Sequence, residues 1–269
     1  MPLLLLLVVS AGAAALTYWA WSWRVWRRSA EVEVEKAIDD ALEDAGPVAR
    51  TTVLVPVMGV LALAVVVIGA LALLVERNTP VRRWDDRVER WAIDQAGPLG
   101  TDVLRLITHL GDTVTVLTLA AVATVLLLTW AKRPRWALFL VVVVVGQWAL
   151  ANAIKWLVGR PRPELEPLAA FSGNSFPSGH TTAAAATYLA LALVVSGVVV
   201  RADRRLLVAV AVGIAVAVGG SRALLGVHWF TDVVAGLLLG WAWCLVSLAV
   251  VDPDRRGSAR PSERAAPTG

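Results

Sequence analysis

Long apolar runs limit most strongly what this chain can fold into. Seven stretches of about 20 residues each consist almost entirely of hydrophobic side chains, and polar linkers join them. Inside a bilayer every backbone N–H and C=O group must be satisfied within the protein, and a helix of this length meets that requirement. Hydrophobic residues make up 58% of the 269 residues, against roughly 45–50% in soluble domains. We therefore expect an all-α fold, a polytopic bundle of membrane helices.

The positions of the runs predict one extra N-terminal span followed by a six-span core. The predicted spans cover residues 2–23, 52–75, 112–131, 136–158, 180–200, 205–222 and 231–251. Positive charge follows the first run instead of preceding it, which favours an uncleaved span over a secretory signal peptide.

These spans divide the chain into four parts. They are an N-terminal transmembrane segment (1–28), a cytoplasmic acidic linker helix (29–51), the six-span core domain (52–251) and a disordered polar tail (252–269). Within the core, the segment 76–111 carries mixed charge, and its Trp84 and Trp91 are seven residues apart, so they share one helical face. This pattern predicts an amphipathic helix at the membrane interface.

The basic residues predict the orientation of the spans. They gather after the first span, in two later linkers and in the tail, as Arg24, Arg27, Arg28, Lys132, Arg133, Arg135, Arg201, Arg204, Arg205, Arg255, Arg256, Arg260 and Arg264. Alternating spans put all four groups on one side, which the positive-inside rule assigns to the cytoplasm. The net charge of +4 therefore reflects topology and does not indicate nucleic-acid binding.

Three polar clusters lie at span ends on the opposite, outer side. The first is Lys155, Arg162 and Pro163, the second is Pro177-Ser178-Gly179-His180, and the third is Ser221-Arg222 followed by His228 and Asp232. Ionisable groups near hydrocarbon are costly, so such clusters indicate a functional site. Together they supply three cations, two imidazoles and one carboxylate, which suits the handling of phosphate.

The third cluster has the pattern of an activated nucleophile. His228 and Asp232 are four residues apart and would share one face of a helix. A carboxylate bonded to one imidazole nitrogen leaves the other nitrogen as a lone pair that can attack a substrate. Arg222, near the end of the preceding span, could bind two phosphate oxygens at once.

The second cluster places His180 at the start of a span, directly after Ser178 and Gly179. Backbone N–H groups at a helix N-terminus suit an anion, and a glycine lets it approach closely. His180 could then protonate the oxygen that leaves phosphorus.

The first cluster adds fixed positive charge. Lys155 and Arg162, with Arg222, could hold a doubly charged phosphate without a metal ion, and Arg160 is an extra cation nearby. The sequence contains no glycine-rich phosphate loop, zinc-ligand spacing or dinucleotide motif, so we expect no cofactor. His109 lies outside the clusters, and we interpret it as an interfacial turn residue.

These motifs resemble those of the type 2 phosphatidic acid phosphatase family of membrane lipid phosphatases. The matching segments are KWLVGRPRP at 155–163, FPSGH at 176–180 and SRALLGVHWFTD at 221–232, and the six-span layout fits as well. The resemblance implies that the core domain is a metal-independent phosphatase domain.

The resemblance also implies a role for each motif residue. His228 would attack phosphorus and form a phosphohistidine, Asp232 would orient it, and His180 would protonate the leaving oxygen and then help to activate water. The phosphate would be bound by Lys155, Arg162, Arg222, Ser178 and Gly179.

We therefore expect a multi-pass protein of the cell membrane that removes phosphate from a lipid at the extracytoplasmic face. Polyprenyl diphosphate, phosphatidic acid and phosphatidylglycerol phosphate are the candidate substrates, with a slight preference for polyprenyl diphosphate because an outward-facing site is where that carrier would be recycled.

A phosphotransferase using the same residues is one alternative, which adding an acceptor alcohol would test. A non-enzymatic lipid or anion transporter is the other, although Gln147 and Asn152 are the main polar residues within the spans. Nothing in the sequence identifies a protein partner.

Overall fold

The computed structural model describes most of the predicted core. It covers residues 48–75, 79–95, 97–163, 168–169, 172–199 and 202–251, together with Leu3, Leu6, Ser10, Ala11, Ala13, Ala14, Thr17 and Tyr18. The predicted tail lies outside the described residues, as do most of the predicted acidic linker and of the extra N-terminal span.

All regular elements in the described ranges are helical, which confirms the all-α expectation. In chain order they are α3 (Val48–Val75), α4 (Pro80–Asp94), α5 (Pro98–Thr108), the 3-10 turn η1 (His109–Gly111), α6 (Thr113–Thr129), α7 (Pro134–Val158), α8 (Gly179–Val198), α9 (Arg204–Leu224) and α10 (Phe230–Val251).

Four of these helices, α7 to α10, are long and apolar enough to cross a membrane by themselves. The number rises to six if each of two bent pairs forms one span: the later part of α3 with α4, and α5–η1 with α6. The predicted six-span core corresponds to the upper end of this range among the described residues.

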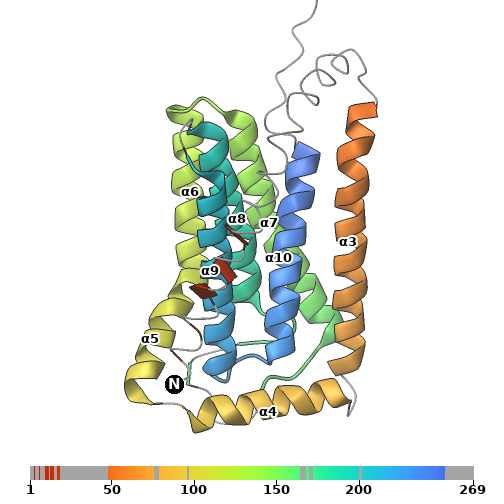
Figure 1. Cartoon of the computed structure of the whole chain (residues 1–269), viewed down its shortest axis with the longest axis vertical. Coiled ribbons are helices and arrows are strands. Elements are labelled where there is room, and N and C mark those ends of the chain that lie inside the picture. The colour runs from red at the N-terminus through yellow and green to blue at the C-terminus, as the bar shows by residue number, and fades with distance from the viewer. Residues whose placement is uncertain are drawn as a thin grey trace, which may run out of the picture.

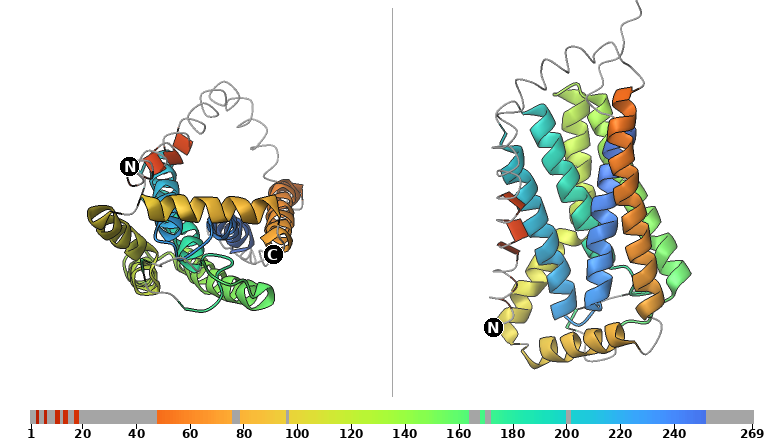
Figure 2. Two further views of the ribbon diagram at one scale, coloured as in Figure 1. Left: turned by 90° about the horizontal axis from the view of Figure 1, so that it is seen from below. Right: turned by 45° about the vertical axis from the view of Figure 1, so that its right-hand side comes forward.

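The long helices stand side by side, and α4 lies across one end of the bundle (Figure 1). Helix α8 packs against α7, α9 and α10 and so forms the centre, while α3 packs on the outer side of α10. Seen from that end, α4 crosses the bundle close to α9, α10 and α3 (Figure 2). The linker between α6 and α7 lies at the opposite end (Figure 1).

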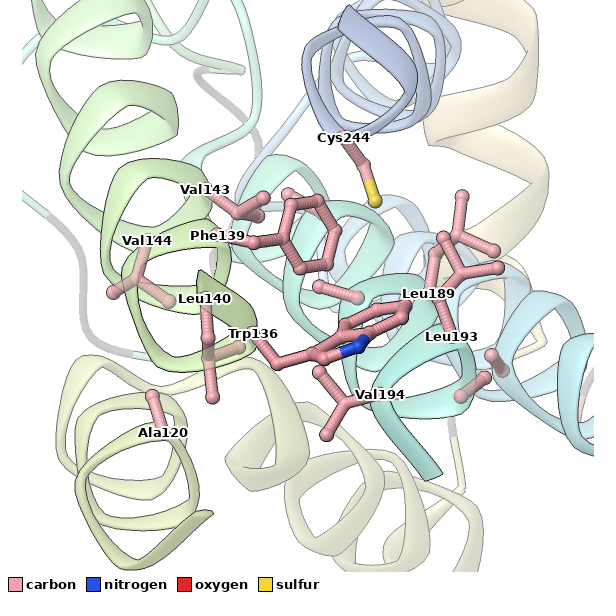
Figure 3. Close-up of a cluster of buried hydrophobic side chains, with 14 of the residues drawn as sticks. Ala120, Trp136, Phe139, Leu140, Val143, Val144, Leu189, Leu193, Val194 and Cys244 are labelled. Carbon is pink, nitrogen blue, oxygen red and sulfur yellow. The ribbon is translucent and has the colours of Figure 1, made fainter. Parts of the chain in front are cut away.

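An apolar core fills the part of the bundle remote from α4. Bulky side chains from the first half of α7 meet the later turns of α8 and the later half of α10, with Trp136 edge-to-face against Phe139 and Cys244 buried beside them (Figure 3). The buried charged side chains, such as Asp85 and Arg160, lie instead toward the α4 end.

Small residues let α8 and α10 approach closely. A Cβ added to Gly240 in α10 would lie 2.6 Å from the carbonyl oxygen of Thr182 and 2.7 Å from the Ala185 side chain. Small residues at such positions are typical of helix pairs in membranes, where close van der Waals packing replaces the hydrophobic effect. This contact holds the beginning of α8 against the middle of α10.

Helix α4 is amphipathic, as predicted. Asp85 and Glu89 are buried on the side facing the bundle, whereas Trp84 and Trp91 are both exposed and share one face. The predicted interfacial segment 76–111 is not a single helix, because α4 ends at Asp94 and the helices α5 and η1 follow from Pro98.

Eight residues of the predicted extra span are described, and each is helical. Leu6 and Ser10 are buried and lie against α9 beside Gly220 and Gly213. The complete span and its orientation stay a prediction.

The Gly240 contact yields a test of the packing. We expect Gly240→Ala to lower the free energy of unfolding by about 1–3 kcal/mol, because the new methyl group must push the α8 backbone away. Gly69→Ala in α3 is the matched control, since no atom lies within 4 Å of its added Cβ. Equal melting temperatures of the two variants in the same detergent would show that α8 and α10 are not tightly packed.

Candidate active site

The three predicted clusters converge at the α4 end of the bundle. A cavity of about 690 Å³ lies among them. Its walls include five of the predicted side chains, namely Lys155, Arg162, His180, Arg222 and His228. Residues up to 73 positions apart therefore meet in one space, as His228 and Lys155 do.

His228 and Asp232 form the expected pair. The imidazole Nδ1 lies 3.4 Å from Asp232 Oδ2, and the other nitrogen, Nε2, lies 3.2 Å from Arg162 Nη1. A guanidinium can only donate hydrogen bonds, so Nε2 must accept and the proton must reside on Nδ1. His228 is thereby held in the tautomer whose Nε2 lone pair points to the cationic side of the cavity.

The environment of His228 also keeps its imidazole neutral. The residue lies in the loop between α9 and α10 and is buried. Burial lowers the pKa of His228 from 6.5 to about 3, the nearby Arg162 and Lys155 also lower it, and Asp232 partly opposes the shift. A neutral imidazole is the nucleophilic form, so His228 is ready to react at ordinary pH.

Backbone carbonyls hold the first two cations in place. Lys155 Nζ donates to the Asn174 carbonyl at 2.7 Å, and Arg162 donates to the carbonyls of Ser172, Gly173 and Val227 at 2.7–2.8 Å. These bonds fix the positions of the cations without neutralising their charge, because a carbonyl carries none. The charge of Lys155 therefore stays available to an anion in the cavity.

Arg222 near the end of α9 is buried and makes one hydrogen bond, from Nη1 to Thr108 Oγ1 at 3.1 Å. Its Nε has no hydrogen-bond partner among the described residues. A buried guanidinium with unmatched donors is costly unless an anion joins it. Arg222 also lines the cavity, so a phosphate bound there would satisfy it.

One residue of the second cluster, Ser178, does not line the cavity. Gly179 and His180 line the cavity, but Ser178 is fully buried behind them. Its hydroxyl accepts from Thr181 Oγ1, and its backbone N–H donates to the Asp232 carbonyl at 3.0 Å. In this geometry Ser178 joins the second cluster to the third rather than touching the cavity.

The extra cation expected at Arg160 does not face the cavity. Its guanidinium is buried and bonded to two carboxylates, Asp232 Oδ1 at 2.5 Å and Asp85 Oδ2 at 2.8 Å. Asp85 comes from α4 and also accepts from the backbone N–H and hydroxyl of Thr231 at the start of α10. Arg160 therefore positions the Asp232 carboxylate, a role that its neighbours in sequence do not reveal.

A second carboxylate of the site, Asp112, was not predicted from the sequence. Asp112, between η1 and α6, has one oxygen 2.7 Å from His180 Nε2 and the other 2.6 Å from His109 Nδ1. The only sequence signal was the closeness of Asp112 to His109, which we interpreted as part of an interfacial turn. Among the described residues no group of three or more His, Cys, Asp or Glu side chains is arranged to hold a metal ion.

Comparisons with known proteins identify the family of this chain. Residues 136–256 match the family model of the PAP2 superfamily. Phosphatidylglycerophosphatase B of Bacillus subtilis (strain 168) is 34% identical over 163 residues, which are 60% of this chain and 79% of that protein. The chain belongs to the PAP2 superfamily. The matched region contains all three motifs.

Two further PAP2 similarities extend this result. A lipid A 1-phosphatase of Rhizobium johnstonii is 37% identical over 124 residues, which are 42% of this chain and 46% of that protein. The crystal structure of the first transmembrane PAP2 type phosphatidylglycerolphosphate phosphatase from Bacillus subtilis gives a TM-score of 0.68 at 28% identity, covering 74% of this chain and 98% of that one. The protein is thus a multi-pass membrane phosphatase of the PAP2 superfamily, with lipid phosphates as the general substrate class.

The buried Arg160 network yields the second prediction. Replacing Arg160 by Met leaves two buried carboxylates without their cation, so we expect the free energy of unfolding to fall by about 3–5 kcal/mol. Arg82→Met is the control, because the guanidinium groups of Arg82 and Arg160 both lie over the Trp229 ring. The Asp86 partner of Arg82 is partly exposed, so about 0–1 kcal/mol is expected. Thermal unfolding in detergent measures both, and an equally small effect of both variants would contradict the positioning role of Arg160.

Proposed function

We propose that this protein hydrolyses a phosphomonoester or diphosphate headgroup of a membrane lipid through a phosphohistidine on His228. One observation carries the proposal: a neutral imidazole, backed by Asp232, directs its Nε2 lone pair toward a cavity lined by three cations. The nucleophile, the carboxylate that orients it and the positive charges that would bind the phosphate then lie together at one site.

Lys155, Arg162 and Arg222 would neutralise the non-bridging oxygens of the phosphate. The backbone N–H of Gly179, at the start of α8, adds a donor and the positive end of the helix dipole. Because Arg162 lies 3.2 Å from His228 Nε2, a phosphate oxygen bound to Arg162 brings phosphorus close to the nucleophile.

The reaction then follows two displacements. His228 Nε2 forms a bond to phosphorus as the bond to the lipid oxygen breaks, and His180 gives that oxygen a proton. Water next attacks the phosphohistidine, His180 takes up one proton from it, and inorganic phosphate leaves with His228 restored. Each step balances, because the proton that His180 gives in the first is regained in the second.

A second cavity supports a substrate with an apolar tail. It has a volume of about 360 Å³, and α6, α7 and α8 line it mainly with apolar side chains such as Val116, Val144 and Ala183. It shares Lys155 and His180 with the cationic cavity. A headgroup and the first part of a hydrocarbon chain would therefore have adjoining places.

The names of the relatives and the expected membrane face bear on the choice among lipids. The name of the Bacillus relative supports phosphatidylglycerol phosphate, and the lipid A 1-phosphatase name supports a phosphate on a bulkier lipid. A site on the extracytoplasmic face would favour polyprenyl diphosphate, because that carrier would be recycled there. The basic α6–α7 linker lies at the end of the bundle opposite to the site, so the positive-inside rule supports the extracytoplasmic face (Figure 1).

The phosphoenzyme gives the third prediction. We expect His228→Ala to lower lipid phosphatase turnover by at least about 10³-fold, because the nucleophile is lost. Purified protein mixed briefly with a ³²P-labelled lipid phosphate and quenched in alkali should carry the label, since phosphohistidine is stable in alkali and labile in acid. His228→Ala should carry none while keeping the wild-type melting temperature. Label or turnover that persists in this folded variant would refute the proposal.

Substrate class and membrane face give the fourth prediction. Right-side-out vesicles should release phosphate from a short-chain, membrane-impermeant lipid phosphate added outside, whereas inside-out vesicles should do so only after they are opened by detergent. A panel of polyprenyl diphosphate, phosphatidic acid and phosphatidylglycerol phosphate in detergent ranks the substrates by kcat/KM. Release by sealed inside-out vesicles alone would place the site on the cytoplasmic face.

A further inference from the structure

The corner between α5 and α6 forms a fourth part of the site, although it carries none of the three motifs. Thr108 accepts a hydrogen bond from Arg222, and Asp112 contacts His180. A Cβ added to Gly111 would lie 2.9 Å from the His180 carbonyl oxygen, so only a glycine lets the corner come this close to α8. The Tyr188 hydroxyl of α8 donates to the Leu110 carbonyl and fixes the corner from the other side.

The Asp112 carboxylate bonds to His180 instead of capping its own helix, α6. The residue occupies the N-cap position of α6, where an aspartate ordinarily accepts a hydrogen bond from the first turn. Its side chain makes no such bond here. Each carboxylate oxygen instead faces a different imidazole, His180 Nε2 on one side and His109 Nδ1 on the other.

The hydrogen-bond chemistry fixes the state of His180. An ionised carboxylate only accepts, so Nε2 of His180 must carry a proton and donate it to Asp112. Nδ1 is then the nitrogen available to the reaction, and it has no hydrogen-bond partner among the described residues. The Asp112 carboxylate also favours the imidazolium, the form that can give up a proton, and so opposes burial and Arg222, which both disfavour that form.

The geometry points to Asp112 as a positioning residue for the general acid, with His109 fixing its second oxygen. Asp112 orients His180 so that Nδ1–H reaches the lipid oxygen as its bond to phosphorus breaks. The Nδ1 proton passes to that oxygen, the Nε2 proton stays on the bond to Asp112, and Nδ1 later accepts a proton from the attacking water. This role rests on the proposed phosphohistidine chemistry and adds a second carboxylate–imidazole pair to it.

The fifth prediction uses two substrates that differ in their need for an acid. An alkyl phosphate has a poor leaving oxygen that must be protonated, whereas a nitrophenyl phosphate releases a stable anion without help. We compare kcat/KM, which reports only the steps up to phosphoenzyme formation and so excludes the attack of water that both substrates share. We expect Asp112→Asn to lower kcat/KM for the alkyl phosphate about 10- to 100-fold, within the usual contribution of acid catalysis. With the nitrophenyl phosphate kcat/KM should fall less than about threefold.

Asp102→Asn is the matched control, because Asp102 is exposed on the neighbouring α5 and pairs only with Arg105 among the described residues. It should leave both substrates unaffected. If Asp112→Asn does not purify as a folded protein, His109→Gln carries the same comparison, since its side chain is 65% exposed. We then expect a loss of about three- to tenfold that is again confined to the alkyl phosphate.

The outcomes separate this role from the proposed function. Equal losses on the two substrates, or no loss on either, would overturn the role of Asp112 while leaving the phosphohistidine mechanism intact. Retained phosphoenzyme in His228→Ala would overturn the mechanism itself, whatever Asp112→Asn does. A selective loss on the alkyl phosphate, together with an unlabelled His228→Ala, would support both.

Discussion

The buried carboxylate of Asp232 is the interaction on which the site depends. It accepts from the His228 imidazole, from the Trp229 backbone N–H and from the Arg160 guanidinium, and it is fully buried. An isolated charge at this depth would be protonated instead, so the paired guanidinium keeps the carboxylate ionised. Arg160 in turn is held by Asp85, which connects the amphipathic helix α4 to Asp232.

The two histidines use carboxylates in opposite ways. His228 donates a hydrogen bond from Nδ1–H to Asp232 and leaves Nε2 toward the cavity, whereas His180 donates from Nε2–H to Asp112 and leaves Nδ1. His228 is buried, while the His180 side chain is 30% exposed. The two roles proposed for these residues, nucleophile and acid, therefore rest on one residue type in two different surroundings.

Much of this arrangement could be predicted from the sequence, and the limits have a physical cause. Apolar runs of bilayer length predicted the helices, and the spacing of His228 and Asp232 predicted their pair, because both patterns depend on neighbours in the chain. The partnerships of Arg160 with Asp85 and of His180 with Asp112 span 75 and 68 residues. Such contacts depend on how helices pack, as at Gly240, and no local pattern contains that information. Ser178 was misplaced for the same reason, since a buried and an exposed serine look alike in sequence.

The surroundings of the site are unequal on its two sides. Helix α4 packs against α9, α10 and α3 and contributes the buried Asp85, so that side is closed by charged and hydrogen-bonded groups. On the α6–α7–α8 side the cationic cavity adjoins the apolar one. A free phosphate would need only the first cavity, and a lipid without charge only the second. A phosphate joined to a hydrocarbon chain is the ligand that gains from both cavities. Removing its charged headgroup from water is costly, and the fixed cations offset that cost. Its hydrocarbon tail stays in an apolar environment throughout.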